Sequence, residues 1–490
     1  MSREISRRGF LRGTLAGAVV VAGFDTQLRS WVSAAELAHW PAATLAEDFP
    51  AFDGTLLLDD ASRTAAADDF GHFVHRQPLA VLRPGSVTDV IKLVQFAWRN
   101  RIKVAARGQA HSTQGQAQVE AGVVIDMATL ATVHEINPTH ALVDGGTRWL
   151  ELLVQTIPQG LTPPTLVDFL ELTVGGTVSL GGIGSQAFRH GPNVDNVLEL
   201  EVVTGDGELV SCSATQNTEL FHSARAGLGQ FGIIVRARLR LIPAPPNTRL
   251  YQAFYSSLPA FLTDLETLID DGRFDTVQGF AVPDGAGGWL FQLETSKYFS
   301  PGQEPNDAAL LSGLAFNPGT QSAQDMTYFD YLNRLAPLVE FLRQIGVWAF
   351  PHPWVNLFVP AANAETLIAE TLADLTVDDV GQGPILIYPF NRDVFRTRFF
   401  RVPNSRHFYI FALLRNAVPP TPERAAELIA ANRKLFERVT MLDGKRYPFD
   451  SVPMTKHDWQ KHYQPLWGAF VSAKRRFDPS VILTPGQGIF

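Results

Sequence analysis

Apolar and polar positions along the first half of the chain predict short strands, turns and a few helices. Between residues 89 and 100, apolar side chains recur three and four positions apart, which is the spacing of one helix face. Ser86 and Asp89 precede this face in a pattern typical of a helix N-terminus. Apolar runs at residues 102–106 and 197–203 predict strands.

A proline-rich break at residues 243–246 is the best candidate for a domain boundary. Beyond this break, helical and strand patterns are mixed, which predicts a second domain of the α+β class. The expected helices cover residues 258–269, 328–341, 362–373 and 422–439, and the expected strands include 289–295, 383–388 and 407–414.

The first residues carry the pattern of an export signal. Arg7 and Arg8 are followed by a short apolar run at residues 14–23 and by small residues at 32–34. This order is typical of a twin-arginine signal peptide, and the apolar run is too short to span a bilayer as a stable helix. We expect residues 1–34 to be removed on export to the periplasm or the cell exterior. The alternative is a basic amphipathic N-terminus without a targeting role.

The composition is that of an ordinary globular protein. At 490 residues, with 46% hydrophobic and 18% charged residues, the chain is long enough for two domains. A formal net charge of −8 argues against a nucleic-acid or anionic-membrane partner. The single cysteine, Cys212, excludes an intramolecular disulfide, and no metal-binding spacing occurs among the 12 histidines. We therefore expect no metal site, no nucleic-acid surface and no stable membrane insertion.

Two glycine-rich stretches in the N-terminal half carry the strongest chemical signal. One spans residues 107–116, directly after a predicted strand, and the other spans residues 165–207. Glycine lets backbone N–H groups approach a ligand closely, so such runs can hold a pyrophosphate without basic side chains. Two of them indicate a large dinucleotide held along its length. Residues 182–187 superficially fit a Rossmann fingerprint, but no β-α-β unit is predicted to open there.

Several motifs in a fixed order extend this signal over residues 79 to 490. They are RPGSVTDV at 83–90, HSTQGQ at 111–116, TVGGTVS at 173–179, FRHGP at 188–192, LGQFGII at 228–234, HPWVNLF at 352–358, GPILIYP at 383–389 and PGQ at 485–487. In these motifs and their order the chain resembles the FAD-linked oxidases of the vanillyl-alcohol oxidase type. Within that family, the resemblance is closest to the cytokinin dehydrogenases.

The resemblance implies an α+β fold with a cofactor domain and a cap domain. Residues 35–246 would form a PCMH-type FAD-binding domain of two subdomains, with its core at about residues 76–245. Residues 247–445 would form the α+β cap, or substrate, domain. Residues 446–490 would return to pack on the FAD-binding domain, because the family places its terminal PGQ motif against the flavin.

The same resemblance implies that FAD is the cofactor and that His111 carries it covalently through a ring nitrogen. Such a bond raises the potential of a flavin and prevents its loss outside the cell. The alternative for His111 is a loop histidine that hydrogen-bonds its neighbours. The residues that match cofactor-binding positions of the family are Gly108, His111, Ser112, Gln116, Asp168, Thr173, Ser179, Ile183, Ile234 and Gln487.

Asp168 matches the position of the family's catalytic aspartate. Oxidation of an amine or alcohol by hydride transfer requires loss of an N–H or O–H proton. A carboxylate partly desolvated by Phe169 and Leu170 is suited to accept that proton. The alternatives are that Asp168 only caps the glycine-rich stretch, or that Glu171 is the base.

On the substrate side, Trp354 and Asn356 match a segment that faces the flavin in cytokinin dehydrogenases. The Trp354 ring would stack on a planar substrate, or alternatively pack in the core. Gln278 stands where the plant enzymes carry a glutamate that hydrogen-bonds adenine, so this chain departs from the family there.

The resemblance implies a reaction as well as a cofactor. The expected reaction is oxidation of the N6 side chain of an adenine-type cytokinin, giving adenine and an aldehyde. The alternative is oxidation of another secondary amine, alcohol or sugar by the same fold and cofactor. The expected electron acceptor is oxygen or a quinone.

Overall fold

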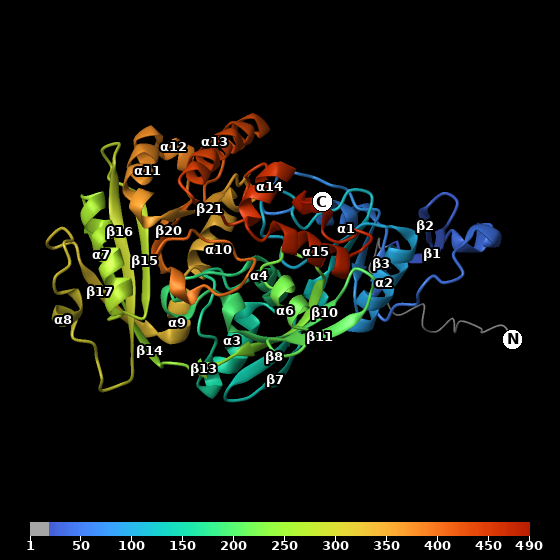
Figure 1. The fold of residues 1–490 in the computed structure, drawn as a ribbon, viewed down its shortest axis with the longest axis horizontal. Helices are drawn as coiled ribbons and strands as arrows, with labels where there is room; N and C mark the ends of the chain where they lie inside the picture. Colours follow the sequence, from blue (N-terminus) through green and yellow to red (C-terminus); the bar gives the residue numbers. More distant parts are fainter. Residues whose placement is uncertain (1–18) are drawn as a thin grey trace.

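The computed structural model describes residues 19–490 (Figure 1). The twin-arginine pair, Arg7 and Arg8, lies outside the described residues. The described chain begins with an antiparallel hairpin of strands β1 (Val21–Asp25) and β2 (Ser30–Ser33), which lies at one end of the molecule. Side chains of this hairpin are buried in the same core cluster as Phe96. Part of the segment expected to be removed on export is therefore packed onto the rest of the protein.

The N-terminal part contains two larger sheets, of which the first has the strand order β3-β4-β6-β5. Helix α2 (Val87–Asn100) connects β4 to β5 and begins at Ser86, whose hydroxyl accepts a hydrogen bond from the Asp89 N–H. The predicted helix and its N-terminal cap are thus confirmed. The remaining elements are α1 (Asp60–Ala66), β3 (Thr55–Leu57), β4 (Ala80–Arg83), β5 (Val104–Arg107) and β6 (Val123–Asp126).

The second sheet is antiparallel and has the order β11-β10-β12-β8-β7. Cys212 is buried in β11 as a free thiol. The elements of this region are β7 (Val133–Ile136), β8 (His140–Asp144), α3 (Trp149–Thr156), β9 (Leu161–Thr162), α4 (Val174–Leu180), α5 (Ala187–His190), β10 (Val197–Val203), β11 (Leu209–Ser213), α6 (Thr218–Ala224), β12 (Ile233–Arg240) and β13 (Ile242–Pro243).

The second glycine-rich stretch is partly helical, because α4 lies within it. The Thr173 hydroxyl caps α4 by accepting from the Gly176 N–H. Gly175 packs against the backbone of Gly145, the residue that follows β8. An added Cβ on Gly175 would lie 2.9 Å from the Gly145 carbonyl oxygen. Glycine therefore permits close helix–backbone packing at this position in addition to any ligand contact.

The cap is built on one antiparallel sheet of order β17-β14-β16-β15-β19-β20-β18-β21, seen at the left in Figure 1. Helices α7 and α11 pack against this sheet and against each other. The elements are β14 (Asn247–Tyr255), α7 (Leu258–Asp271), β15 (Thr276–Pro283), β16 (Trp289–Phe299), α8 (Asp307–Leu311), β17 (Ser322–Thr327), β18 (Val355–Pro360), α11 (Ala361–Asp374), α12 (Val377–Val380), β19 (Ile385–Asn391), β20 (His407–Leu413) and α13 (Pro422–Met441).

One expected cap helix is divided. The pattern at residues 328–341 predicted a single helix, but the structure has α9 (Tyr328–Leu332) and α10 (Ala336–Gln344). Pro337 lies in the first turn of α10, where a proline is accommodated, and it prevents one continuous helix because it lacks an N–H. The break places Arg334 in the connection between the two helices.

The C-terminal segment runs from the cap sheet to strand β5 of the N-terminal part. Strand β21 (Lys445–Arg446) still pairs with the cap sheet, and α14 (Lys456–Tyr463) and α15 (Trp467–Phe477) follow it. Beyond them, Val104 of β5 donates to the Ile482 carbonyl and accepts from the Thr484 N–H, both at 2.8 Å. No helix among residues 19–490 is long and apolar enough to cross a membrane.

Candidate active site

A cavity of about 390 Å³ is lined jointly by the N-terminal part and the cap. The loop after β5, helix α4 and the start of β12 contribute from one side, and α10, β18 and β19 contribute from the cap. All but one of the predicted site residues lie on its wall. They are Gly108, His111, Ser112, Gln116, Asp168, Thr173, Ser179, Ile183, Ile234, Trp354, Asn356 and Gln487.

The loop that carries His111 is held from behind by the buried carboxylate of Asp69. Asp69 accepts hydrogen bonds from the backbone N–H groups of Gly71 and Gly115, at 3.0 and 2.6 Å. Gly115 has a φ of +73°, a backbone conformation that favours glycine. Burial raises the pKa of Asp69 to about 7, while the two N–H donors lower it. The loop conformation therefore depends on a residue that no motif singled out.

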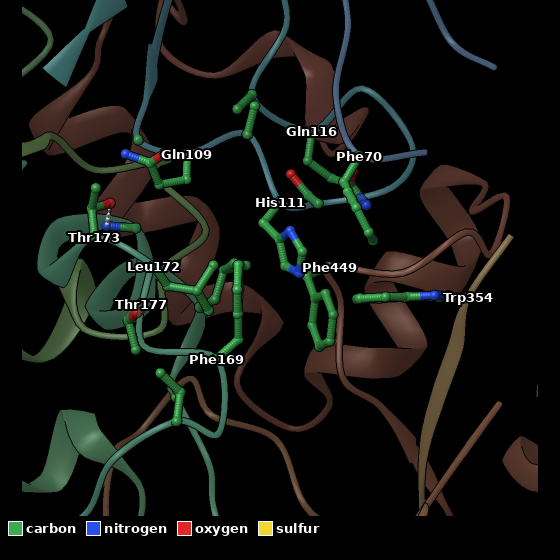
Figure 2. Close-up of a pocket in the computed structure, with 18 of the residues that line it drawn as sticks. Phe70, Gln109, His111, Gln116, Phe169, Leu172, Thr173, Thr177, Trp354 and Phe449 are labelled. Carbon is green, nitrogen blue, oxygen red and sulfur yellow. Dashed lines mark hydrogen bonds between the residues drawn. The ribbon is translucent and has the colours of Figure 1, made fainter. Parts of the chain in front are cut away.

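The His111 ring lies within a group of aromatic side chains (Figure 2). Its centroid is 4.2 Å from that of Phe70, 4.8 Å from that of Phe169 and 5.3 Å from that of Trp354. Burial, and secondarily the ring of His352, lowers the pKa of His111 to about 3. The imidazole is therefore neutral near pH 7, with a lone pair on one ring nitrogen. That is the state from which a histidine can form a bond to an electrophilic carbon.

The wall fits a large ligand such as FAD. An added Cβ on Gly108 would lie 2.1 Å from the Thr173 hydroxyl oxygen, so the loop backbone and the α4 cap come together only because residue 108 is glycine. Trp354 Nε1 and Asn356 Nδ2 are buried donors without a hydrogen-bond partner among the described residues. Buried donors of this kind need a partner, and a bound cofactor or substrate would supply one.

Asp168 faces the cavity from the segment before α4, and its partners come from the cap. Its Oδ1 accepts from Arg334 Nη2 at 3.1 Å, and its Oδ2 accepts from the Tyr388 hydroxyl at 3.3 Å. Burial raises the pKa of Asp168 above its usual value, whereas Arg334 and Tyr388 act to lower it. Because Thr173 caps α4, Asp168 is free of the capping role that was its alternative.

Glu171, the alternative base, points elsewhere. It forms an ion pair with Arg148 at the start of α3 and is absent from the cavity wall. Its side chain is 30% exposed and already neutralised by a surface guanidinium. Among the two carboxylates, the geometry therefore favours Asp168.

Gln278 is the predicted site residue that the cavity does not reach. It is buried on β15, where its Nε2 donates to the Glu294 carboxylate and its Oε1 accepts from Arg334 Nη2 at 3.3 Å. Both polar ends of the amide are thus engaged within the cap. The expectation of a direct substrate contact is corrected here: Gln278 lies behind Arg334, and Arg334 lies against Asp168.

Several residues on the cavity wall or directly behind it were not predicted from the sequence. Arg334 and Tyr388 meet Asp168 across 166 and 220 chain positions, and no local pattern reports such a contact. Tyr388 lies inside the GPILIYP motif at 383–389, and this motif was the one feature of the sequence that could have pointed to it. Phe70 and Trp348 complete the aromatic wall around His111, at centroid distances of 4.2 and 6.0 Å.

Two family models match the chain. Residues 78–213 match a model described as "FAD binding domain". Residues 281–490 match a model described as "Cytokinin dehydrogenase 1, FAD and cytokinin binding". Both matched regions contribute residues to the wall of the cavity.

Curated relatives match over most of their length. An "Uncharacterized oxidoreductase ORF5 in fasciation locus" of Rhodococcoides fascians is 40% identical over 87% of this chain and 97% of its own. Cytokinin dehydrogenase 1 of Arabidopsis thaliana is 36% identical over 89% of this chain and 83% of its own. Cytokinin dehydrogenase 9 of Oryza sativa subsp. japonica is 35% identical over 89% of this chain and 90% of its own.

A solved structure supports the fold. The VAO-type flavoprotein MtVAO615 from Myceliophthora thermophila C1, determined at pH 5.0, superposes with a TM-score of 0.67. The match covers 85% of this chain and 80% of that one, at 15% identity. The mixed α+β architecture with a cofactor domain and a second, cap domain is therefore shared.

Proposed function

Because the chain belongs to the cytokinin dehydrogenase family of FAD-dependent oxidoreductases, we propose that it oxidises the N6 side chain of an adenine-type cytokinin. The products would be adenine and an aldehyde. The observation that carries the proposal is that the Asp168 carboxylate and the aromatic group around His111 line the same cavity.

FAD, when bound, supplies a two-electron acceptor that takes a hydride from the carbon next to the N6 amine. The role of Asp168 is to accept the amine proton as that C–H bond breaks. The raised pKa of Asp168 makes it a stronger base than an ordinary aspartate, because burial disfavours its charged form. Water would then hydrolyse the resulting imine.

The cavity offers apolar surfaces to a planar substrate. Phe169 and Trp354 stand on either side of His111, and α10 adds the side chains of Leu338 and Leu342. Aromatic and aliphatic walls favour a flat ring system with an apolar tail. A sugar would leave most of its hydroxyl groups without partners on such a wall.

The second candidate is oxidation of another secondary amine or alcohol. It is favoured by one observation, that Gln278 lies behind Arg334 instead of reaching a substrate. Anaerobic mixing with isopentenyladenine should bleach the oxidised flavin band if the first proposal holds. Bleaching by simple secondary amines or benzylic alcohols, and not by isopentenyladenine, would favour the second.

We further propose that the flavin is covalently bound at His111 and that the protein is exported by the twin-arginine route. The neutral His111 imidazole supports the covalent bond, and Arg7 and Arg8 followed by an apolar run support the export. The proposed electron acceptor is oxygen or a quinone. Rates of reoxidation of the reduced flavin by each, compared in stopped flow, would decide between them.

A further inference from the structure

Behind Asp168 lies a buried network of charged and polar cap residues. The Arg334 guanidinium bonds Asp168 through Nη2 at 3.1 Å and Glu294 through Nε at 3.3 Å. The side chains of Arg334 and Glu294 are only 16% and 12% exposed, so solvent screens their interaction weakly. The centroid of the Tyr331 ring lies 4.7 Å from the guanidinium carbon, within the range of a cation–π contact.

Gln278 joins the two charged partners of this network. Its amide oxygen accepts from Arg334, and its amide nitrogen donates to Glu294. As a neutral side chain, it orders the guanidinium and the carboxylate without adding a charge. Two carboxylates, Asp168 and Glu294, therefore share one guanidinium.

We propose that Arg334 is a positioning residue that keeps Asp168 ionised and aimed into the cavity, and that Glu294 weakens this hold by competing for the same guanidinium. The inference rests on the proposed role of Asp168 as the base. It adds that proton acceptance by Asp168 is set by the charge balance of Arg334 and Glu294, two residues that themselves touch neither flavin nor substrate.

The groups that face Asp168 come from three elements. Arg334 approaches from the connection between α9 and α10, Glu294 from β16 and Tyr388 from β19. The neutral Tyr388 hydroxyl donates a hydrogen bond to Oδ2 of Asp168. The charged Arg334 guanidinium bonds only Oδ1. An opposite charge at this range favours the ionised carboxylate, and a like charge disfavours it. The two neighbours should therefore act with opposite sign.

Charge substitutions test this sign directly in the holoenzyme. Arg334→Gln removes the cation, so the pH below which anaerobic flavin reduction is lost should rise by about 1–3 units. Glu294→Gln removes the competing anion, so the same midpoint should fall. Gln278→Glu adds an anion beside Arg334 and should raise it. Arg334→Lys keeps the charge and should return the midpoint most of the way to the wild-type value.

A measurement without substrate separates this inference from the proposed function. Infrared titration of the Asp168 carboxyl, identified by its loss in Asp168→Asn, should give the same order of midpoints. Flavin content and melting temperature report whether each variant folds. If Arg334→Gln does not fold, the nearly isosteric Glu294→Gln still tests the inference. Equal midpoints in wild type, Glu294→Gln and Gln278→Glu would overturn the inference. A wild type whose flavin no cytokinin reduces would overturn only the proposed function.

Discussion

At the scale of the residue, His111 has a neutral imidazole ring that is surrounded by aromatic side chains. We predict that acid-precipitated wild-type protein stays yellow and that His111→Ala releases its flavin on precipitation, because the covalent bond is lost. His352→Gln is the matched control, since it removes another buried imidazole stacked on Phe70 but leaves His111 in place. Free flavin in the supernatant of acid-treated wild type would contradict the covalent assignment.

Asp168 carries the second prediction at this scale. Asp168→Asn keeps the side-chain volume and removes the basicity, so flavin reduction should slow by about two to four orders of magnitude. Flavin content and melting temperature should change little, because the cofactor wall is built by other residues. Glu171→Gln, on the exposed ion pair with Arg148, should reduce its flavin at nearly the wild-type rate. The opposite ranking of the two variants would make Glu171 the base.

Residues that a local motif singled out lie on the cavity wall. His111 and Thr173 lie in contiguous motifs, and both line the cavity. The partners of Asp168 could not be predicted, because 166 and 220 positions separate them from it. Gln278 was predicted from the resemblance to the plant enzymes, and only the tertiary contacts show that it lies behind Arg334 and off the cavity wall.

At the scale of the element, capping and amphipathic spacing were reliable guides, as α2 and its Ser86 cap show. Glycine was harder to interpret, because the same residue serves ligand approach and helix packing. Gly108 illustrates both uses, since its hydrogen faces the Thr173 hydroxyl that caps α4. The apolar spacing at residues 328–341 predicted one helix although Pro337 lies within it. In the structure the helix is divided, and Pro337 lies in the first turn of α10.

We predict that Gly108→Ala destabilises the junction between the His111 loop and α4. The new methyl group would lie 2.1 Å from the Thr173 hydroxyl oxygen, so Thr173 must move and its cap is lost. Loss of a cap costs about 1 kcal/mol, and the flavin content should fall with it. Gly468→Ala is the control, because no atom lies within 4 Å of its added Cβ and alanine favours the surrounding helix. Equal flavin content in Gly108→Ala and wild type would show that the junction tolerates the methyl group.

At the scale of the whole molecule, the proline-rich break predicted two domains and the resemblance implied a returning C-terminal segment, but neither predicted the strand order. The cap sheet places β19 between β15 and β20, and so joins segments about a hundred residues apart. Such long-range pairing is set by the packing of complete faces, which local spacing does not encode. The same limitation applies to the N-terminal hairpin, whose apolar residues were attributed to an export signal.

That hairpin gives the last prediction. Phe24 and Trp31 are 2% and 8% exposed, and their ring centroids lie 5.4 and 5.8 Å from that of Phe96 in α2. Burial of each such side chain contributes roughly 1.5–3 kcal/mol, so a chain that begins at residue 35 should melt several degrees below one that begins at residue 19.

The N-terminus of the exported protein, read by mass spectrometry, then locates the cleavage. Because the hairpin is part of the folded core, we expect cleavage upstream of Val19 instead of after Ala34. Export itself should depend on Arg7 and Arg8, and replacement of both by lysine should retain the protein in the cytoplasm. A secreted protein that begins at Ala35 and melts with the full-length chain would show that the hairpin contributes nothing to the mature enzyme, and the original boundary would stand.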